Sequence, residues 1–349
     1  MRTVYIGSRT TAARGGRGKG IAVYSVLDNG AWELRQVAEQ INPSYLCRDR
    51  TEKYLYAVHG DCSEISSYAI QPDGTISYLG TETTGGTNPV HVCADVSNRW
   101  LFVANLQTGS VSVLQRLADG RTSAPVHQYF IAGNGGPGYV SHPHQVQPDV
   151  TGNYLIVSAQ GRAQGLGQVD VFKIDHAAGT LQLMDTVRAR TIAEPRHCVF
   201  DPTGAVCYGV NEKDYSVTQY AFSSGKLTPV RIVSTLFPDQ VAEGWASGIA
   251  ILPSGKILFT SDRKQDRISV FQVSEQDGFL TLMDSIPSGG RQPRFICIGP
   301  DGQSLIVANE LSDTVYEIPV DEAACILGEP ILRAKTGSPV CVAFSRTTT

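Results

Sequence analysis

Two stretches share one pattern, AEPRHCVFDPTGAVCYGVNE at residues 193–212 and GGRQPRFICIGPDGQSLIVANE at residues 289–310. Each passes from Pro-Arg through an apolar segment to a Pro-x-Gly turn, and returns through a second apolar segment to Asn-Glu. Short apolar segments separated by Gly and Pro turns predict pairs of antiparallel β-strands. Because the whole strand-turn-strand unit recurs, the sequence indicates a repeat architecture.

A short strand that ends in an aromatic or aliphatic residue marks each repeat. The copies are IAVY (21–24), ISSY (65–68), VSVL (111–114), VDVF (169–172), VTQY (217–220), ISVF (268–271) and VYEI (315–318). Most copies are flanked by three further apolar segments, so each unit is predicted to have four strands. Four strands in a period of about 40 to 50 residues are typical of a β-propeller blade.

The two ends of the chain complete the count of blades. The C-terminal PVCVAFSR (339–346) is an inner strand without a second strand, and TVYIGS (3–8) is a second strand without an inner one. Together they predict an all-β, seven-bladed β-propeller, a single domain over residues 1–349, closed by N- and C-terminal strands in one blade. Closure pairs strand edges that would otherwise be exposed.

Composition argues against several classes of partner. The net charge of −4 with no basic tract argues against nucleic acid. The first residues lack a signal-like apolar segment, and no apolar run reaches the length of about 18 residues that a membrane span needs. Eight cysteines without a CxxC pair indicate reduced thiols and a cytoplasmic protein. We expect no metal, no cofactor and no obligate protein partner, because metal-ligand spacings are missing and a closed propeller folds alone.

Aligning the repeats on the first turn of each unit locates a candidate site. The start of the inner strand then carries Ser44, Val90, His142, Arg196, Ser247, Arg294 and Val340. The far end of the second strand carries Gln160, Glu212, Arg263 and Glu310 in four successive units. Because neighbouring strands are antiparallel, the start of one lies beside the end of the next. Both sets are therefore predicted to line one mouth of the propeller.

The charged residues of this predicted mouth suit acid–base chemistry on an anionic compound. Arginines bind carboxylate or phosphate through two parallel hydrogen bonds, and His or Glu can move a proton. His144 has the strand parity of His142 and is expected to face the channel, whereas His197 is expected to point between blades. The alternative interpretation is that the Arg–Glu pairs only tie neighbouring blades together.

The stretches SHPHQVQPD, EPRHCVFDP, YGVNE, SDRKQDRISVFQV and QPRFICIGPDGQSLIVAN resemble the seven-bladed propeller lactonase family. That family includes bacterial propeller-type 6-phosphogluconolactonases and fungal 3-carboxy-cis,cis-muconate lactonizing enzymes. The resemblance covers nearly the whole chain and implies a central-mouth active site with His142, Arg196, Glu212 and Arg263 as catalytic residues. Many relatives have Asp-Leu-Gly after the second strand of the fourth blade, where this chain has AQGRAQGLGQ.

Three functions follow as hypotheses. The first is a lactonase that hydrolyses a sugar-acid lactone, with 6-phospho-D-glucono-1,5-lactone as a candidate; Arg294, His144 and Glu310 would bind the substrate, and Glu212 or His142 would act as the base. The second is a carboxymuconate cycloisomerase that uses the same arginines. The third is a non-catalytic scaffold, although the recurring Gly-His and Trp-Asp pairs of WD repeats are missing from the sequence.

Overall fold

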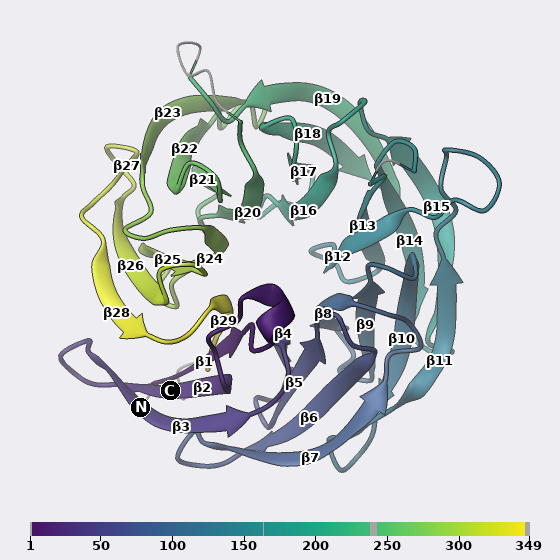
Figure 1. Ribbon diagram of the computed structural model, residues 1–349. Helices are drawn as coiled ribbons and strands as arrows, with labels where there is room; N and C mark the ends of the chain where they lie inside the picture. Colours follow the sequence, from purple (N-terminus) through teal and green to yellow (C-terminus); the bar gives the residue numbers. More distant parts are fainter. Residues whose placement is uncertain (1, 163, 238–242, 346–349) are drawn as a thin grey trace.

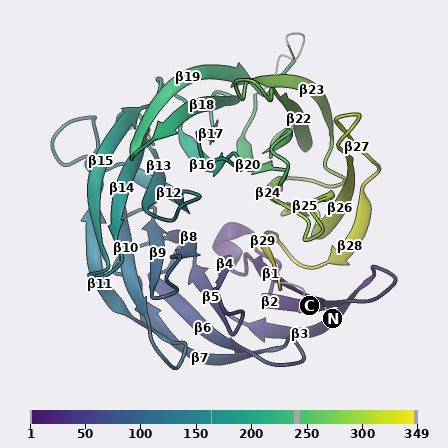
Figure 2. The same ribbon diagram turned by 180° about the vertical axis from the view of Figure 1, so that it is seen from behind.

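The computed structural model describes residues 2–162, 164–237 and 243–345, which form seven β-sheets arranged in a ring (Figure 1). Six sheets have four strands each, and the seventh has five. The helical content of these residues is one 3-10 turn, η1 (Ala12–Arg14), which lies over the centre of the ring in Figure 1. The predicted all-β, seven-bladed propeller is confirmed, and Figure 2 shows the same ring from behind.

Each blade runs from an inner strand beside the axis to an outer strand at the rim. In chain order, the first three blades are β29 (Pro339–Phe344), β1 (Arg2–Ser8), β2 (Gly20–Val26), β3 (Trp32–Glu39); β4 (Pro43–Arg48), β5 (Tyr54–His59), β6 (Glu64–Ile70), β7 (Ile76–Thr83); and β8 (Pro89–Ala94), β9 (Trp100–Asn105), β10 (Ser110–Arg116), β11 (Thr122–Phe130). The next two are β12 (His142–Pro148), β13 (Tyr154–Gln160), β14 (Gln168–Asp175), β15 (Thr180–Arg188); and β16 (Pro195–Phe200), β17 (Val206–Asn211), β18 (Ser216–Ser223), β19 (Lys226–Ser234). The last two are β20 (Ala246–Ile251), β21 (Ile257–Asp262), β22 (Arg267–Val273), β23 (Leu280–Pro287); and β24 (Pro293–Ile298), β25 (Ser304–Asn309), β26 (Thr314–Asp321), with β27 (Ile326–Leu327) and β28 (Ile331–Lys335) both pairing with β26.

Strands from the two ends of the chain close the ring. The C-terminal β29 pairs antiparallel with the N-terminal β1, with Val4 opposite Phe344 and Ile6 opposite Val342. The predicted closure is therefore confirmed. The residues that follow β1 enter one mouth of the propeller because β1 is the second strand of this blade.

An aspartate at the first turn of several blades explains why the chain reverses there. In the β4–β5 turn, Asp49 accepts hydrogen bonds from the backbone N–H groups of Lys53 and Tyr54 at 2.8 and 3.0 Å. The turn is thus held by its own side chain, as Asp favours in short turns. The equivalent aspartates that accept backbone N–H groups in the same way are Asp95, Asp149 and Asp201.

Apolar side chains between neighbouring blades form the core. Between the β8–β11 and β12–β15 blades, Trp100, Phe102, Val157 and Phe172 pack in one buried cluster. Because neighbouring blades cover both faces of the second strand of each sheet, strands such as β5 and β9 are nearly continuous apolar runs. This packing makes the ring a rigid frame for the side chains that face the axis.

A β-bulge interrupts the inner strands at the same point around the ring. In β16, Pro195 pairs with Asn211 and His197 with Val210, so Arg196 is an extra residue in the ladder. Such a bulge turns the extra side chain away from the regular alternation. The residues at the bulges, here called the throat ring, are Ser44, Val90, His144, Arg196, Ser247, Arg294 and Val340.

Candidate functional site

A second ring lies at the same mouth, just beyond the end of each second strand. The N–H of Glu212 donates to the carbonyl of Glu194 at 2.9 Å, and the N–H of Glu310 donates to Gln292 at 2.9 Å. These bonds continue the strand ladder by one step and fix where each side chain leaves the backbone. The equivalent residues, here called the mouth ring, are Arg9, Gly60, Leu106, Gln160, Glu212, Arg263 and Glu310.

Glu212 is the centre of the charged cluster. Its Oε2 atom lies 3.3 Å from Nε of Arg196, 3.0 Å from Nη2 of Arg263, and accepts a 3.1 Å hydrogen bond from Gln160. Its Oε1 atom accepts the indole N–H of Trp245 at 2.9 Å. Burial alone would raise the pKa of Glu212, but the charges of Arg263 and Arg196 with these hydrogen bonds lower it to about 2.

The two arginines that contact Glu212 are held on their other sides as well. Arg196 donates to the carbonyl of Ser247 at 2.7 Å, and Arg263 donates to the carbonyl of Ala246 at 3.1 Å. The Arg263 guanidinium also lies 3.9 Å from the ring centroid of Trp245, within cation–π range. The side chains of Arg196, Arg263 and Glu212 form one buried network, as the sequence alignment predicted.

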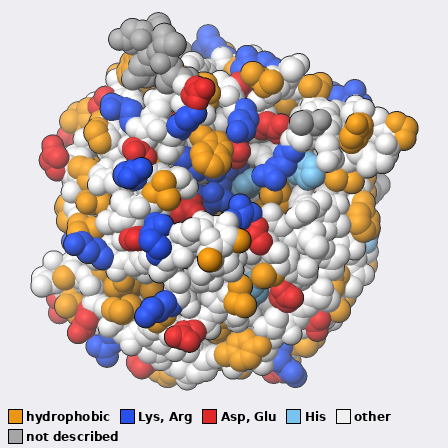
Figure 3. Space-filling model, in the orientation of Figure 1, with side chains coloured by type: hydrophobic (Ala, Val, Ile, Leu, Met, Phe, Trp, Pro, Cys, Tyr) orange, Lys and Arg blue, Asp and Glu red, His pale blue; other side chains and the backbone are white. Residues whose placement is uncertain are grey.

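Arg294 and Glu310 form a second, looser pair. Nη1 of Arg294 lies 3.6 Å from Oε2 of Glu310, and that oxygen accepts a 2.8 Å hydrogen bond from the Gln292 side chain. The charge of Arg294 also lowers the pKa of Arg196, after burial and the charge of Arg263. The predicted charged residues therefore share one mouth, and Figure 3 shows Lys and Arg side chains gathered there around a central hollow.

His142 lies at this mouth with one ring nitrogen fixed. Its Nδ1 atom is 2.8 Å from the carbonyl oxygen of Leu106, which can only accept, so Nδ1 carries the proton. Nε2 then bears the lone pair, and within the described part of the chain it is buried without a hydrogen-bond partner. Because His142 pairs with Gln160 across the strands, and the Gln160 amide donates to Glu212, the backbone of His142 lies at the same mouth as Glu212.

The predicted equivalence of His142 with Arg196 is wrong by two residues. The turn Asp149-Val150-Thr151-Gly152 matches Asp201-Pro202-Thr203-Gly204, so the turn position belongs to Val150 rather than Pro148. The bulge of β12 accordingly falls at His144. His144 occupies the throat ring, whereas His142 lies one step outside it, in the position of Glu194 and Gln292.

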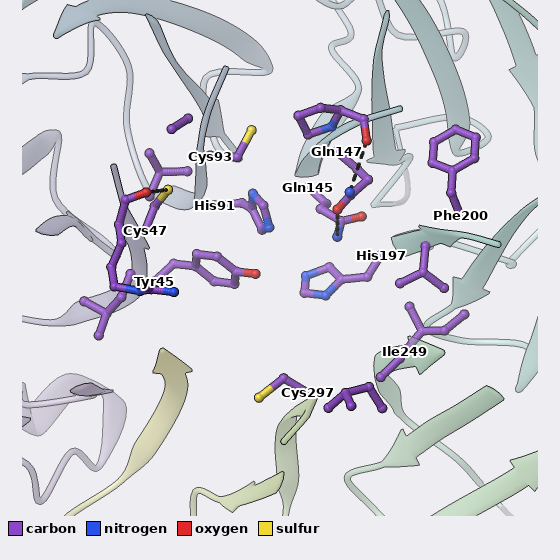
Figure 4. Close-up of a pocket in the computed structure, with 18 of the residues that line it drawn as sticks. Tyr45, Cys47, His91, Cys93, Gln145, Gln147, His197, Phe200, Ile249 and Cys297 are labelled. Carbon is purple, nitrogen blue, oxygen red and sulfur yellow. Dashed lines mark hydrogen bonds between the residues drawn. The ribbon is translucent and has the colours of Figure 1, made fainter. Parts of the chain in front are cut away.

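The expectation that His197 points between blades is also wrong. Its ring faces the axis of the propeller, opposite His91 and Tyr45 (Figure 4). The bulge at Arg196 breaks the strand alternation, so two consecutive side chains turn inward. The ring centroids of His144 and His197 are 5.2 Å apart, and those of His197 and His91 are 5.8 Å apart. Burial and the charge of Arg196 lower the pKa of all three histidines, so they are neutral at pH 7.

Arg9 is a member of the site that the sequence alignment missed. It follows β1, and its N–H donates to the carbonyl of Ser338 at 3.0 Å, as the N–H of Glu212 does to Glu194. Its side chain is buried and lines the narrow throat together with Arg196 and Arg294. The signal was present in the sequence, because Arg9 stands where Glu212 and Glu310 stand, one residue past a second strand.

A much larger cavity lies at the opposite end of the axis. It has a volume of about 750 Å³, and Figure 4 shows Tyr45, His91 and Gln145 directed into it, with the cysteine thiols around them. Burial raises the pKa of Cys47 to about 11 and that of Cys297 to about 12, so these thiols stay protonated. The throat cavity beneath the mouth ring is much smaller, about 20 Å³. Size favours the first cavity, but the buried network of Glu212 with Arg196 and Arg263 beside His142 favours the mouth ring, and we assign the candidate site there.

Neither a metal cluster nor a spanning helix is found in residues 2–162, 164–237 and 243–345. Over these ranges, no three His, Cys, Asp or Glu side chains are arranged to hold a metal ion. Likewise, none of the helical segments within them has the length and apolar character needed to cross a membrane.

The chain is similar in sequence and structure to several known proteins. Residues 3–344 match the family model described as lactonase, 7-bladed beta-propeller. The chain is 31% identical over 310 residues to a 6-phosphogluconolactonase of Serratia proteamaculans (strain 568), covering 87% of this chain and 89% of that one. It is 25% identical to a 6-phosphogluconolactonase of Bacillus subtilis (strain 168), covering 98% and 99%. The structure of the periplasmic gluconolactonase PpgL of Pseudomonas aeruginosa superposes with a TM-score of 0.86 at 24% identity over 98% of both chains, which shows a common fold.

Proposed function

The chain belongs to the seven-bladed β-propeller lactonase family, and we propose that it hydrolyses a sugar-acid lactone at the mouth ring. The observation that carries the proposal is a mouth at which the buried guanidinium groups of Arg196 and Arg263 lie on Glu212, with His142 beside them; among the described residues, Nε2 of His142 has no hydrogen-bond partner. A base and a preorganised positive charge are the two components that hydrolysis of a lactone requires.

In the proposed mechanism, His142 is the general base. Its Nε2 takes a proton from water while the water oxygen bonds to the lactone carbonyl carbon, and the carbonyl oxygen gains the negative charge. The guanidinium groups of Arg196 and Arg263 stabilise that oxyanion. When the ring C–O bond breaks, the proton on His142 passes to the leaving alkoxide oxygen, and the product is an open hydroxy acid.

Glu212 has a different role in this mechanism. Both of its carboxylate oxygens are already occupied, and its pKa is near 2, so it is a poor base at neutral pH. It holds Arg196 and Arg263 in place and keeps them from repelling one another. We therefore assign Glu212 as the residue that positions the arginines.

The charge at the mouth favours an anionic substrate. Four arginines line the two rings, and two glutamates oppose them; these are Arg9, Arg196, Arg263, Arg294, Glu212 and Glu310. The surplus of two positive charges matches a phosphate monoester, which carries a charge of about −1.5 to −2 at pH 7. Together with the names of the relatives, this supports 6-phospho-D-glucono-1,5-lactone as the substrate. The eight free thiols agree with reaction in the reducing cytoplasm.

A panel of lactones tests the proposal. Purified protein would be given 6-phosphogluconolactone and glucono-1,5-lactone, and acid release would be followed at constant pH, with His142→Gln as the matched inactive variant. We expect rapid opening of the phosphorylated lactone and loss of that activity in the variant. Carboxymuconate would be tested in parallel by its ultraviolet absorbance. Loss of the diene signal without any lactone hydrolysis would identify a cycloisomerase instead.

A further inference from the structure

Three arginines of the site are buried, and two of them, Arg196 and Arg263, form ion pairs with Glu212. The third, Arg9, does not contact Glu212 and pairs with Asp61 instead. It reaches the throat from the blade that both chain termini close, and it lines the same small cavity as Ser44 and Arg294. Only 4% of its surface is exposed. A guanidinium group buried to this degree needs an anionic partner, because an uncompensated buried charge is costly.

The carboxylate that binds Arg9 is shared with a second arginine. Nη1 of Arg9 lies 3.4 Å from Oδ2 of Asp61, but Asp61 is bound through both oxygens by Arg14, whose Nε donates at 2.6 Å. Arg294 is in the same situation, because its 3.6 Å partner Glu310 accepts a shorter bond from Gln292. Arg9 and Arg294 are therefore held by their carboxylates more weakly than Arg263 is held by Glu212 at 3.0 Å.

The same two arginines are close enough to repel. Burial and then the charge of Arg294 lower the pKa of Arg9 to about 10. Arg9 and Arg294, each with a shared carboxylate, line one water-sized cavity together with Arg196, and a bound anion would stabilise this arrangement of like charges.

The mouth ring leaves room for this arrangement at one position. Gly60 occupies the place of Glu212 in the β4–β7 blade, and a Cβ atom there would lie 2.5 Å from Nη1 of Arg9 and 2.8 Å from Oγ of Ser44. Any side chain at residue 60 would thus displace the guanidinium. The backbone of Gly60 does not have a left-handed φ, so the requirement for glycine comes from the space that Arg9 fills.

We propose that Arg9 and Arg294 form an anion subsite that receives one terminal oxygen of the substrate's phosphoryl group. The proposal rests on the function given above and names the residues that recognise the phosphate monoester. The throat cavity of about 20 Å³ has room for about one water-sized group, so a single oxygen enters while the sugar ring stays in the mouth. Arg263, and Arg196 at the edge of the same cavity, stay held by Glu212 and serve the lactone carbonyl.

Binding of inorganic phosphate to the full chain tests the subsite without reference to activity. Titration calorimetry would compare the unaltered protein with Arg9→Gln, Gly60→Ala and the control Arg17→Gln. Arg17 lies on the same segment but pairs with Asp313 at 2.8 Å and is outside the throat cavity. We expect Arg9→Gln to weaken phosphate binding about tenfold to a hundredfold, as loss of a charge-assisted hydrogen bond does, and Arg17→Gln to bind normally. Gly60→Ala keeps Arg9 but displaces its guanidinium group. Weaker phosphate binding by this variant would therefore show that the position of the guanidinium group matters.

Kinetics with two lactones give the second readout. In Arg9→Gln, the KM for 6-phosphogluconolactone should rise at least about ten times more than the KM for glucono-1,5-lactone. Thermal unfolding of each variant would show that it is folded. Phosphate binding of unaltered strength in both Arg9→Gln and Gly60→Ala, or an equal rise in KM for both lactones, would overturn the subsite. If the unaltered protein opens no lactone, the proposed function fails, and the phosphate titration alone still decides the subsite.

Discussion

The two ends of the propeller axis are both lined by inner strands but differ in the residues they present. At one end, the mouth and throat rings present arginines, glutamates and His142; at the other, a cavity of about 750 Å³ is lined by thiols, Tyr45 and neutral histidines, together with charged side chains such as Arg48, Asp49 and Arg50. In the mouth ring, the charged side chains come from the blades that begin with β16, β20 and β24 and from the closing blade. The two blades that begin with β4 and β8 contribute the uncharged Gly60 and Leu106 to this ring. A repeat fold supplies equivalent backbone positions, and the residue type at each position decides which end can carry out chemistry.

Of the substitutions that test this difference between the two ends, replacement of His142 should reduce activity most. We expect His142→Gln to lower kcat/KM for the substrate by about 10²- to 10⁴-fold, the usual contribution of a general base, with little change in melting temperature. His91→Gln is the matched control, because His91 is a buried histidine that lines the opposite cavity. Steady-state kinetics of both variants measure these changes in kcat/KM. Full activity in His142→Gln together with inactivity in His91→Gln would reverse the assignment of the two ends.

Replacing Glu212 should cost stability as well as activity. Glu212→Gln leaves Arg196 and Arg263 buried without their carboxylate, and breaking such a buried ion pair costs about 3 to 5 kcal/mol. Urea unfolding measures the loss. The control is Glu275→Gln, because Glu275 is largely exposed and pairs with Lys256 on the surface, where a pair is worth about 0 to 1 kcal/mol. Equal losses in both variants would mean that the mouth network is not held by charge.

The acid limb of the stability curve tests the same network. The pKa of Glu212 is lowered from 4.5 to about 2 in the folded protein, so its stabilising contribution is fully present above the unfolded value of 4.5. That contribution should decline as the pH falls from about 5 towards 2 and should be missing in Glu212→Gln. Urea unfolding midpoints of both proteins, measured at several pH values, give the size of this contribution. Parallel acid curves for the two proteins would contradict the low pKa.

The thiols of the opposite cavity should give the smallest effect. We expect Cys93→Ala to change kcat/KM by less than about twofold, since the pKa of this thiol is raised well above its usual value and a protonated thiol is a poor nucleophile. In the native protein, Cys47, Cys93 and Cys297 should react slowly with a disulfide reagent and rapidly once unfolded. Stoichiometric labelling within the mixing time of the native protein would show that this end of the axis is reactive after all.

Much of the fold could be predicted from the sequence because its signals are local. Strand periodicity, Pro-x-Gly turns and the recurrence of the unit predicted seven blades and their closure, and both are confirmed. The same alignment predicted that Arg196 and Glu212 would meet, which they do because antiparallel neighbours put the start of one strand beside the end of the other.

Three features of the site could not be predicted from these local sequence signals. A bulge changes where a side chain points without any residue type that announces it, so His197 was placed between blades. The throat position was given to His142 instead of His144 because the turn of that blade was aligned on Pro148 instead of Val150. The closing blade divides its strands between the chain ends, so Arg9 was separated from its equivalents by the numbering. The tautomer of His142 depends on a carbonyl from the neighbouring blade.

The sequence by itself determined the number of blades, the closing pair of strands and the mouth at which the charges gather, because each follows from periodicity and strand direction. Only the tertiary structure decided which nitrogen of His142 is free, that Glu212 is saturated, and that Arg9 and Arg294 share a throat. These depend on distances between blades, and packing around the ring sets those distances. A residue therefore obtains its chemistry from a neighbour that lies tens or hundreds of positions away in the chain.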